Sequence, residues 1–233
     1  MDKNEVRENN SLQNFLTDLV RRVEDIRRWK RYPHNYKQTV LGHTLETALL
    51  TQIVIAIEQT AGTQFDAYLL LSTAVNHDLG EGIIGDISYS IKNDPRVKAM
   101  IELIEKEQFE LMFAALDFGP YSQAVANMFS RSFAVQEHTD TVEGALFNAI
   151  EKIGYVIFAL REIDEGNGIF VQVLNNHHKD LVAYSERFPS IKLIYGKCLE
   201  HMKHIGTSVL LQYKFDLSWL GYIVHNTPDE REI

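Results

Sequence analysis

The sequence contains a single cysteine, Cys198, among 233 residues, so it cannot form an intrachain disulfide. Its first residues are charged and offer no apolar run of the kind that a secretory signal peptide carries. It also lacks the roughly 20 uninterrupted apolar residues that a membrane-spanning helix needs. The most apolar stretches, 45–57 and 68–75, are short and contain polar residues. We therefore expect a cytoplasmic protein that does not enter a membrane.

Cationic residues are scarce relative to acidic ones. The chain has 23 Lys and Arg against 32 Asp and Glu, which gives a formal net charge of −9 at pH 7. Nonspecific binding of nucleic acid depends on cationic side chains that displace counterions. Duplex nucleic acid is therefore not an expected partner, whereas a small anion bound through a metal ion is compatible with this charge.

Signals for β-structure, internal repeats and low-complexity linkers are absent. Apolar residues recur instead at spacings of three and four, which predicts helices. With 45% hydrophobic residues the chain can bury a sizeable core. We expect an all-α protein with one domain over 11–227, a flexible N-terminus at 1–10 and an acidic tail at 228–233. The expected helices are 12–29, 42–59, 65–78, 95–116, 120–136, 141–163, 169–187 and 190–211.

Two imidazoles and two carboxylates stand out along these helices. His43 begins the second expected helix, His77 and Asp78 end the third, and Glu151 lies inside the sixth. Such a mixed nitrogen and oxygen set suits one divalent transition ion (Mn, Fe, Co, Ni or Zn) better than Mg or Ca. Adjacent residues of a regular helix point about 100° apart. His77 and Asp78 can therefore share an ion only where the helix ends, and glycines at 80, 82 and 85 are expected to end it.

The stretch 76–87 reads Asn-His-Asp-Leu-Gly-Glu-Gly-Ile-Ile-Gly-Asp-Ile, and its histidine follows His43 by 34 residues. This pattern resembles the HD-domain phosphohydrolases, and within them the branch of the bacterial 5′-deoxynucleotidases. The resemblance covers roughly 19–161. It implies a single HD-domain helical bundle, here with additional C-terminal helices, and a metal-dependent activity.

The resemblance also implies the metal ligands. By similarity His43, His77 and Asp78 bind the ion. Further along, Glu143 aligns with a glutamate of the family, and Glu151 stands eight residues later where the family usually has its last ligand, an aspartate. Glu151 is therefore expected to be the fourth ligand. Its alternative is a glutamate on a solvated helix face, which is common on amphipathic helices.

Other residues of the same motifs are expected to contact the substrate or move protons. Arg28 and Trp29 resemble the Arg-Trp element that precedes the first metal histidine of the family, so Arg28 is expected to contact a phosphate and Trp29 to line the substrate site. The stretch 31–33, Arg-Tyr-Pro, is a competing match for the same element. Glu81 is expected to act as a general acid or base. Asp86, by resemblance, places the attacking water or the sugar.

Taken together, these residues predict a phosphohydrolase of a small phosphorylated metabolite, with a (deoxy)nucleoside 5′-monophosphate as the leading substrate. Two alternatives stay open. One is a hydrolase of nucleoside triphosphates, cyclic nucleotides or guanosine alarmones. The other is a weakly active nucleotide-binding sensor, which the departure at Glu151 keeps open. A homodimer is compatible with the sequence.

Overall fold

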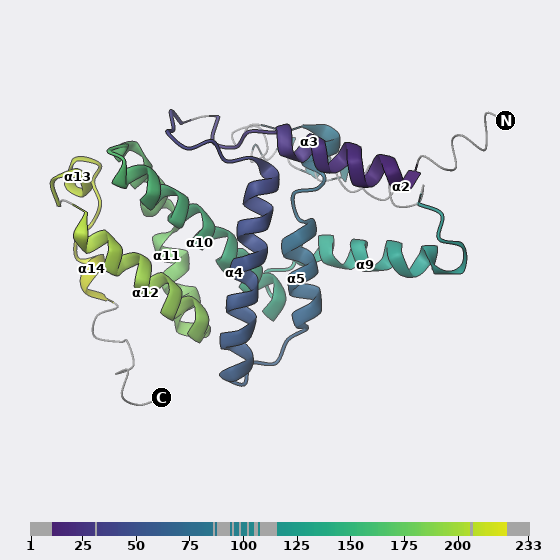
Figure 1. The fold of residues 1–233 in the computed structure, drawn as a ribbon. Coiled ribbons are helices and arrows are strands. Elements are labelled where there is room, and N and C mark those ends of the chain that lie inside the picture. The colour runs from purple at the N-terminus through teal and green to yellow at the C-terminus, as the bar shows by residue number, and fades with distance from the viewer. Residues whose placement is uncertain are drawn as a thin grey trace. The chain divides into compact units, whose positions relative to one another are not determined.

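The computed structural model describes residues 11–30, 32–85, 87, 94, 96–97, 99–101, 103–104, 107, 116–205 and 207–222. Within these residues all regular elements are helices, apart from one isolated bridge between Arg27 and Thr39 (Figure 1). The all-α prediction is confirmed. The expected flexible N-terminus and acidic tail lie outside the described residues, as does most of the expected helix 95–116.

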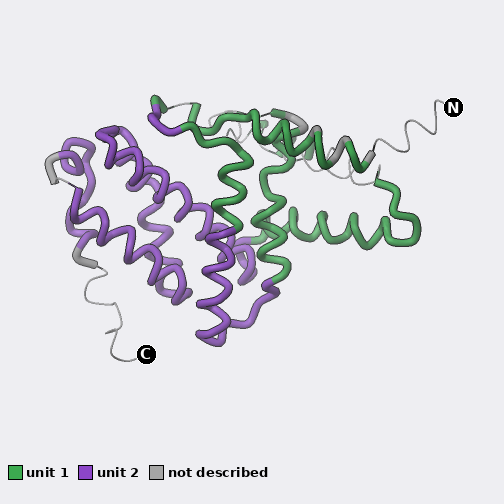
Figure 2. The backbone as a smooth tube through the Cα atoms, viewed as in Figure 1, with its two compact units in different colours: residues 1–33, 37–48, 68–138 green, residues 34–36, 49–67, 139–233 purple. Residues whose placement is uncertain are grey.

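The chain forms two compact units (Figure 2). Unit 1 comprises residues 1–33, 37–48 and 68–138, and unit 2 comprises residues 34–36, 49–67 and 139–233. The expectation of one domain over 11–227 stays a prediction.

Unit 1 begins with a helical run whose end differs from the expected one. The run consists of α2 (Ser11–Gln13), the π-helical turn η1 (Asn14–Leu19) and α3 (Val20–Asp25). It stops at Asp25 rather than near Trp29, because the next residues pair with a distant segment. The Arg28 amide donates to the Gln38 carbonyl (2.9 Å), and the Val40 amide donates to the Ile26 carbonyl (3.0 Å). These two hydrogen bonds place Arg28 beside the start of the next helix.

The helix α4 (Val40–Thr60) is fixed at both ends. At its start, Thr39 Oγ1 accepts a hydrogen bond from the Gly42 amide (3.0 Å), as a helix N-cap does. At its end, Gly62 adopts a left-handed φ of 84°, and the Thr63 amide donates to the Glu58 carbonyl (3.0 Å). This hydrogen bond belongs to the Schellman pattern that commonly closes helices. The expected helix 42–59 is thus found, with its start two residues earlier.

By length and composition, α4 alone among the described helices could cross a membrane. Its most apolar window has a mean hydropathy of 1.6, and a third of that window is buried. Core helices of soluble proteins satisfy the same two criteria, so this finding is weak evidence for a membrane segment. Within α4, the side chain of Glu58 is fully buried and accepts hydrogen bonds from the amide and the hydroxyl of Ser190.

Unit 1 also contains three further named helices. They are α5 (Ala67–Asn76), α6 (Glu81–Ile84) and α9 (Ser122–Ala134), the last flanked by the short turns η2 (Gly119–Tyr121) and η3 (Val135–Glu137). The α6 helix packs against α3, and a Cβ atom at Gly82 would lie 2.7 Å from Leu19 Cδ1. A larger residue at this position would therefore require the side chains of Leu19 and Val23 to shift. Leu79, between α5 and α6, joins an apolar cluster with Leu116, Val125, Phe129 and Phe133.

Unit 2 is dominated by three long helices that pack against one another. Its elements after residue 139 are α10 (Val142–Asp164), η4 (Gly168–Phe170), α11 (Val171–Arg187), α12 (Pro189–His204), α13 (Thr207–Gln212) and α14 (Trp219–Tyr222). Thr141 caps α10 by accepting a hydrogen bond from the Gly144 amide (3.0 Å). The expected helix 190–211 is interrupted at Ile205, which has an extended ψ of 133°. The helix α14 was not expected.

A buried carboxylate of α10 holds the loop 34–36 within unit 2. The side chain of Glu162 is fully buried and accepts hydrogen bonds from the Asn35 amide (2.9 Å) and the Tyr36 amide (2.8 Å). Asn167 Nδ2 donates to the same carboxylate (2.9 Å). The Arg161 guanidinium lies 3.4 Å from the centre of the Tyr36 ring. Three interactions thus hold two residues of a loop that has no regular structure of its own.

Candidate metal centre and active site

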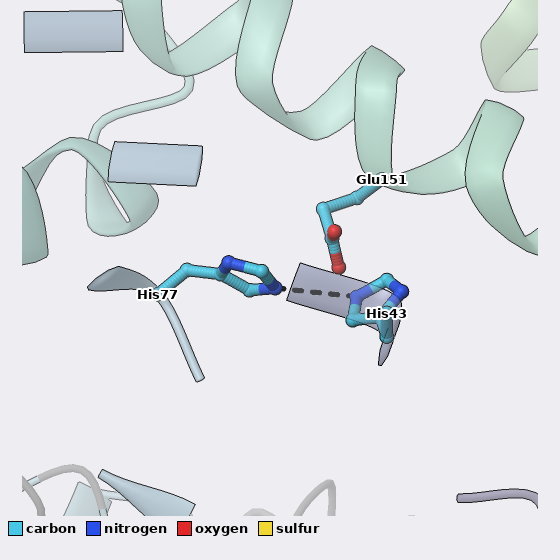
Figure 3. A group of neighbouring side chains, drawn as sticks. All are labelled: His43, His77 and Glu151. Atoms are coloured by element: carbon cyan, nitrogen blue, oxygen red, sulfur yellow. Dashed lines mark hydrogen bonds between the residues drawn. The ribbon is translucent and has the colours of Figure 1, made fainter. Parts of the chain in front are cut away.

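The two predicted metal histidines meet in unit 1. His43 lies in the first turn of α4, and His77 follows directly after α5. Their Nε2 atoms are 3.2 Å apart, and the rings meet edge to face with centroids 5.2 Å apart (Figure 3). Both side chains are almost fully buried, with 3% and 2% exposed. Buried imidazoles that present the same nitrogen to one point are suited to hold a cation.

The tautomer of His77 is set by the backbone. His77 Nδ1 lies 2.9 Å from the Ala74 carbonyl oxygen. A carbonyl only accepts hydrogen bonds, so Nδ1 carries the proton, and Nε2 of the neutral ring keeps its lone pair. Metal-binding histidines are commonly oriented by a hydrogen bond of this kind from the other ring nitrogen. His77 is therefore prepared to bind an ion through Nε2.

Asp78 faces the same point as the two imidazoles. Its Oδ2 atom is 3.2 Å from His77 Nε2 and 3.7 Å from His43 Nε2. Neighbouring residues can converge here because α5 has ended at Asn76. The next residues form tighter turns in which the Leu79 amide donates to the Asn76 carbonyl three residues back (3.1 Å).

The glycines that follow α5 do not end it in the expected way. The glycines at 80, 82 and 85 were expected to end the helix, but Gly80 keeps a right-handed φ of −58°. Of the three, only Gly85 has a left-handed φ, of 81°, and it ends α6.

Arg28 contributes the positive charge nearest to these ligands. Its Nη1 atom pairs with Asp78 Oδ2 at 2.5 Å. Burial alone would raise the pKa of the Asp78 carboxyl, but His77, Arg28 and His43 together hold that pKa well below its usual range. Asp78 is thus ionised and could serve as an anionic ligand, and the Arg28 guanidinium lies directly beside it.

A buried polar network holds the turn that carries His77 and Asp78. Thr73 Oγ1 donates to the Ser132 carbonyl (3.1 Å), and Asn76 Nδ2 donates to Ser132 Oγ (3.1 Å). Gln136 Nε2 donates to the His77 carbonyl (3.4 Å). These bonds tie the end of α5 to the α9 region.

Glu151 joins the two histidines in Figure 3. One carboxylate oxygen of Glu151 and one ring nitrogen each of His43 and His77 lie within 4.8 Å of one another. Glu151 is half-buried on α10, and Tyr155 donates a hydrogen bond to its Oε2 atom (2.8 Å). The neighbouring Lys152 pairs with Asp180 of α11 (2.9 Å). Its positive charge is therefore engaged by another carboxylate.

The distances among the donor atoms fit a shared ion. Metal–ligand bonds of about 2.0–2.2 Å place neighbouring donors of one transition ion roughly 2.8–3.6 Å apart, from octahedral to tetrahedral geometry. The separations of 3.2, 3.2 and 3.7 Å among His43, His77 and Asp78 are close to this range. The donor set of two nitrogens with carboxylate oxygens is the one predicted from the sequence, and it suits a borderline transition ion. The residues present therefore fit the expected metal.

Two further predicted site residues are close in sequence to this group: Trp29 follows Arg28 directly, and Glu81 follows Asp78 by three residues. Glu81 begins α6, is half-buried, and its amide donates to the Asp78 carbonyl (3.1 Å). Trp29 has a left-handed φ of 64°, and its indole N–H donates to Gln38 Oε1 (2.8 Å). The predicted catalytic Asp86 lies outside the described residues, and so does Arg31, the competing match for Arg28. Their roles stay predictions.

Histidines without an assigned role have other partners. His178 is buried, lies 2.7 Å through Nδ1 from the Tyr195 hydroxyl, and stacks on Trp219 with centroids 3.9 Å apart. Burial lowers the pKa of His178 to about 4. His201 is half-exposed and pairs with Asp164 at 2.8 Å. Neither belongs to a group of three or more possible ligands among the described residues.

Sequence reasoning did not single out Tyr155 or Gln38. Tyr155 stands four residues after Glu151, a spacing that places two side chains on one helix face, so a local signal existed. Gln38 bonds the Trp29 indole and also donates to Glu46 Oε2 (2.5 Å). Nothing in the sequence around Gln38 indicates this bridging position.

Solved structures share this fold. The chain aligns with an HD-domain phosphohydrolase from Listeria innocua with a TM-score of 0.71 and 19% identity, over 93% of this chain and 99% of that chain. It aligns with a Pyrococcus horikoshii OT3 protein with a TM-score of 0.59 and 17% identity, over 86% and 98%. No curated protein matches the sequence. The fold is thus the helical fold of HD-domain phosphohydrolases, as predicted.

The family of the chain follows from its sequence. The YfbR-like 5′-deoxynucleotidase family matches residues 14–202, a range that contains every predicted site residue. The chain belongs to this family. It is a phosphoric ester hydrolase, a metal-dependent phosphohydrolase of nucleotides. The predicted family, fold class and enzyme class are confirmed.

Proposed function

We propose that the protein removes phosphate from (deoxy)nucleoside 5′-monophosphates. One observation carries the proposal: His43, His77 and Asp78 present three donor atoms within 3.7 Å of one another, with Arg28 bonded to the third. A cation and a guanidinium side by side form a binding site for a terminal phosphate. Family membership favours the 5′-monophosphate as the substrate.

We propose that His43, His77, Asp78 and Glu151 hold one divalent transition ion. Such an ion lowers the pKa of a bound water and neutralises charge that builds on phosphorus. The chain's own contribution is to hold its donors in place. His77 is oriented by the Ala74 carbonyl, and the Arg28 guanidinium beside Asp78 favours its ionised form. The net charge of −9 makes a local positive charge necessary for an anionic substrate.

The remaining roles fall to residues that flank the ligands. Arg28 has five N–H donors in a planar fork, so it can contact a phosphate while one nitrogen keeps its bond to Asp78. Glu81, at the start of α6, takes the proton of the attacking water or supplies one to the leaving sugar oxygen. We assign Asp86 to placing the water or the sugar, and Trp29 to lining the substrate site. The chain is proposed to act in the cytoplasm.

The proposal is tested by screening the purified protein against nucleotides. The panel contains deoxy- and ribonucleoside 5′-monophosphates, 3′-monophosphates, triphosphates, cyclic nucleotides and guanosine tetraphosphate, each with Mn²⁺, Co²⁺, Ni²⁺ or Zn²⁺. We expect inorganic phosphate from 5′-monophosphates, and no turnover by His77→Ala. His201→Ala is the matched control, because His201 pairs with Asp164 away from the ligands. Preferred turnover of triphosphates, cyclic nucleotides or guanosine tetraphosphate would overturn the assignment of 5′-monophosphates as the substrates. Nucleotide binding without turnover would indicate a sensor.

A further inference from the structure

We infer that Tyr155 is a positioning residue that holds Glu151 in the orientation needed to bind the metal ion. The inference rests on the proposed function, in which Glu151 is a ligand. Its basis is the hydrogen bond from the Tyr155 hydroxyl to Glu151 Oε2, at 2.8 Å. Both residues lie in the middle of α10, one helical turn apart, where side chains four positions apart share a face.

The longer side chain of glutamate creates the need for such a residue. Glutamate has one more rotatable bond than aspartate, so more conformational entropy is lost when its carboxylate is fixed. A neighbouring donor that fixes the carboxylate before the ion binds reduces this loss at the binding step. The Tyr155 hydroxyl is such a donor, and it binds one of the two carboxylate oxygens.

The surroundings of Tyr155 keep its hydroxyl in place. Its ring packs against the His177 ring of α11, with centroids 5.3 Å apart and an angle of 40° between the planes. The helices α10 and α11 form one of the main packing contacts of unit 2. Burial, together with Lys152, lowers the pKa of His177 to about 4, so its ring is neutral at pH 7. Lys152, the cation that lowers the pKa of His177, itself pairs with Asp180.

The test compares Co²⁺ binding by chelator-treated full-length variants, followed through the visible absorbance of the bound ion. Tyr155→Phe removes only the hydroxyl. We expect its Kd for Co²⁺ to rise about tenfold or more, the usual effect of losing an outer partner of a metal ligand. Tyr184→Phe is the matched control. Its hydroxyl also donates to a side chain of α10, but that side chain is Asn148, through Oδ1 (3.1 Å), rather than Glu151.

A double variant separates a positioning role from a general structural one. If Tyr155 acts through Glu151, Tyr155→Phe adds no further loss of Co²⁺ affinity in the Glu151→Gln background. An equal loss in both backgrounds would overturn the inference, and so would an unchanged Kd for Tyr155→Phe while Glu151→Gln binds weakly. In the latter case Glu151 would still be a ligand. If Glu151→Gln itself binds Co²⁺ normally, the proposed ligand set fails, and the inference fails with it.

Discussion

The buried carboxylate of Glu162 provides a measurable test of how the loop 34–36 is held. Glu162→Gln keeps the size of the side chain but replaces one acceptor oxygen by an NH₂ group, which then faces an amide donor. A hydrogen bond to a charged group contributes about 1.5–3 kcal/mol, and a solvent-accessible donor recovers part of that from water. Asn35 is exposed. We therefore expect a loss of about 2 kcal/mol in the free energy of unfolding.

The loss of stability caused by Glu162→Gln should depend on pH in a defined direction. Burial alone would raise the pKa of Glu162, but hydrogen bonds from Asn35, Tyr36 and Asn167 and the nearby His34 lower it below 4.5. A carboxyl whose pKa is depressed in the folded state stabilises the protein fully above its unfolded pKa, and this contribution is lost as the pH falls through the folded pKa. The difference between wild type and Glu162→Gln should thus be largest near pH 7 and shrink below about pH 4.5.

Urea unfolding at pH 7 and near pH 4, monitored by circular dichroism, measures both effects. Glu165→Gln is the matched control, because Glu165 accepts one hydrogen bond from the Tyr36 hydroxyl (2.7 Å) at the exposed end of the same helix. We expect it to change stability by less than about 1 kcal/mol. Equal stability of Glu162→Gln and wild type, or a difference that does not change with pH, would refute the reasoning.

The remaining predictions concern the metal centre. Protein purified without chelator should contain close to one transition ion per chain, and His77→Ala or Asp78→Ala should lose it, because one of four ligands is gone; full occupancy by elemental analysis in both variants would contradict the assignment. Glu81→Ala should keep the metal while turnover falls roughly 10²-fold or more, and unchanged turnover would remove Glu81 from the mechanism. Glu151→Asp should weaken metal binding and Glu151→Gln should weaken it more, whereas normal binding and activity of Glu151→Gln would make Glu151 a surface residue.

The local patterns of the sequence predicted the elements that carry the site. The long helices α4 and α10 were expected because apolar residues recur at helical spacing and Thr141 and Gly62 mark ends. The HD motif then indicated which side chains of these helices would meet. His43 and His77 do meet, although 34 residues separate them in the chain.

Features that depend on distant partners were not predictable in this way. The helix α3 ends at Asp25 because Ile26 and Arg28 pair with residues 38–40, and periodicity within one segment cannot show such pairing. Glu162 looks like an ordinary charged residue near a helix end, yet it is buried because a loop more than 120 residues earlier donates two amides to it. Local sequence holds no signal for that approach.

The polar network behind His77 has a consequence for hydrogen exchange. The end of α5 cannot open without breaking the bonds from Thr73 and Asn76 to Ser132, which is fully buried in α9. Amides joined in this way exchange with solvent in the same cooperative opening event. The slowest-exchanging amides around His77 should therefore report the opening of α9, so the stability of the turn that carries His77 and Asp78 depends on a helix that contributes neither residue.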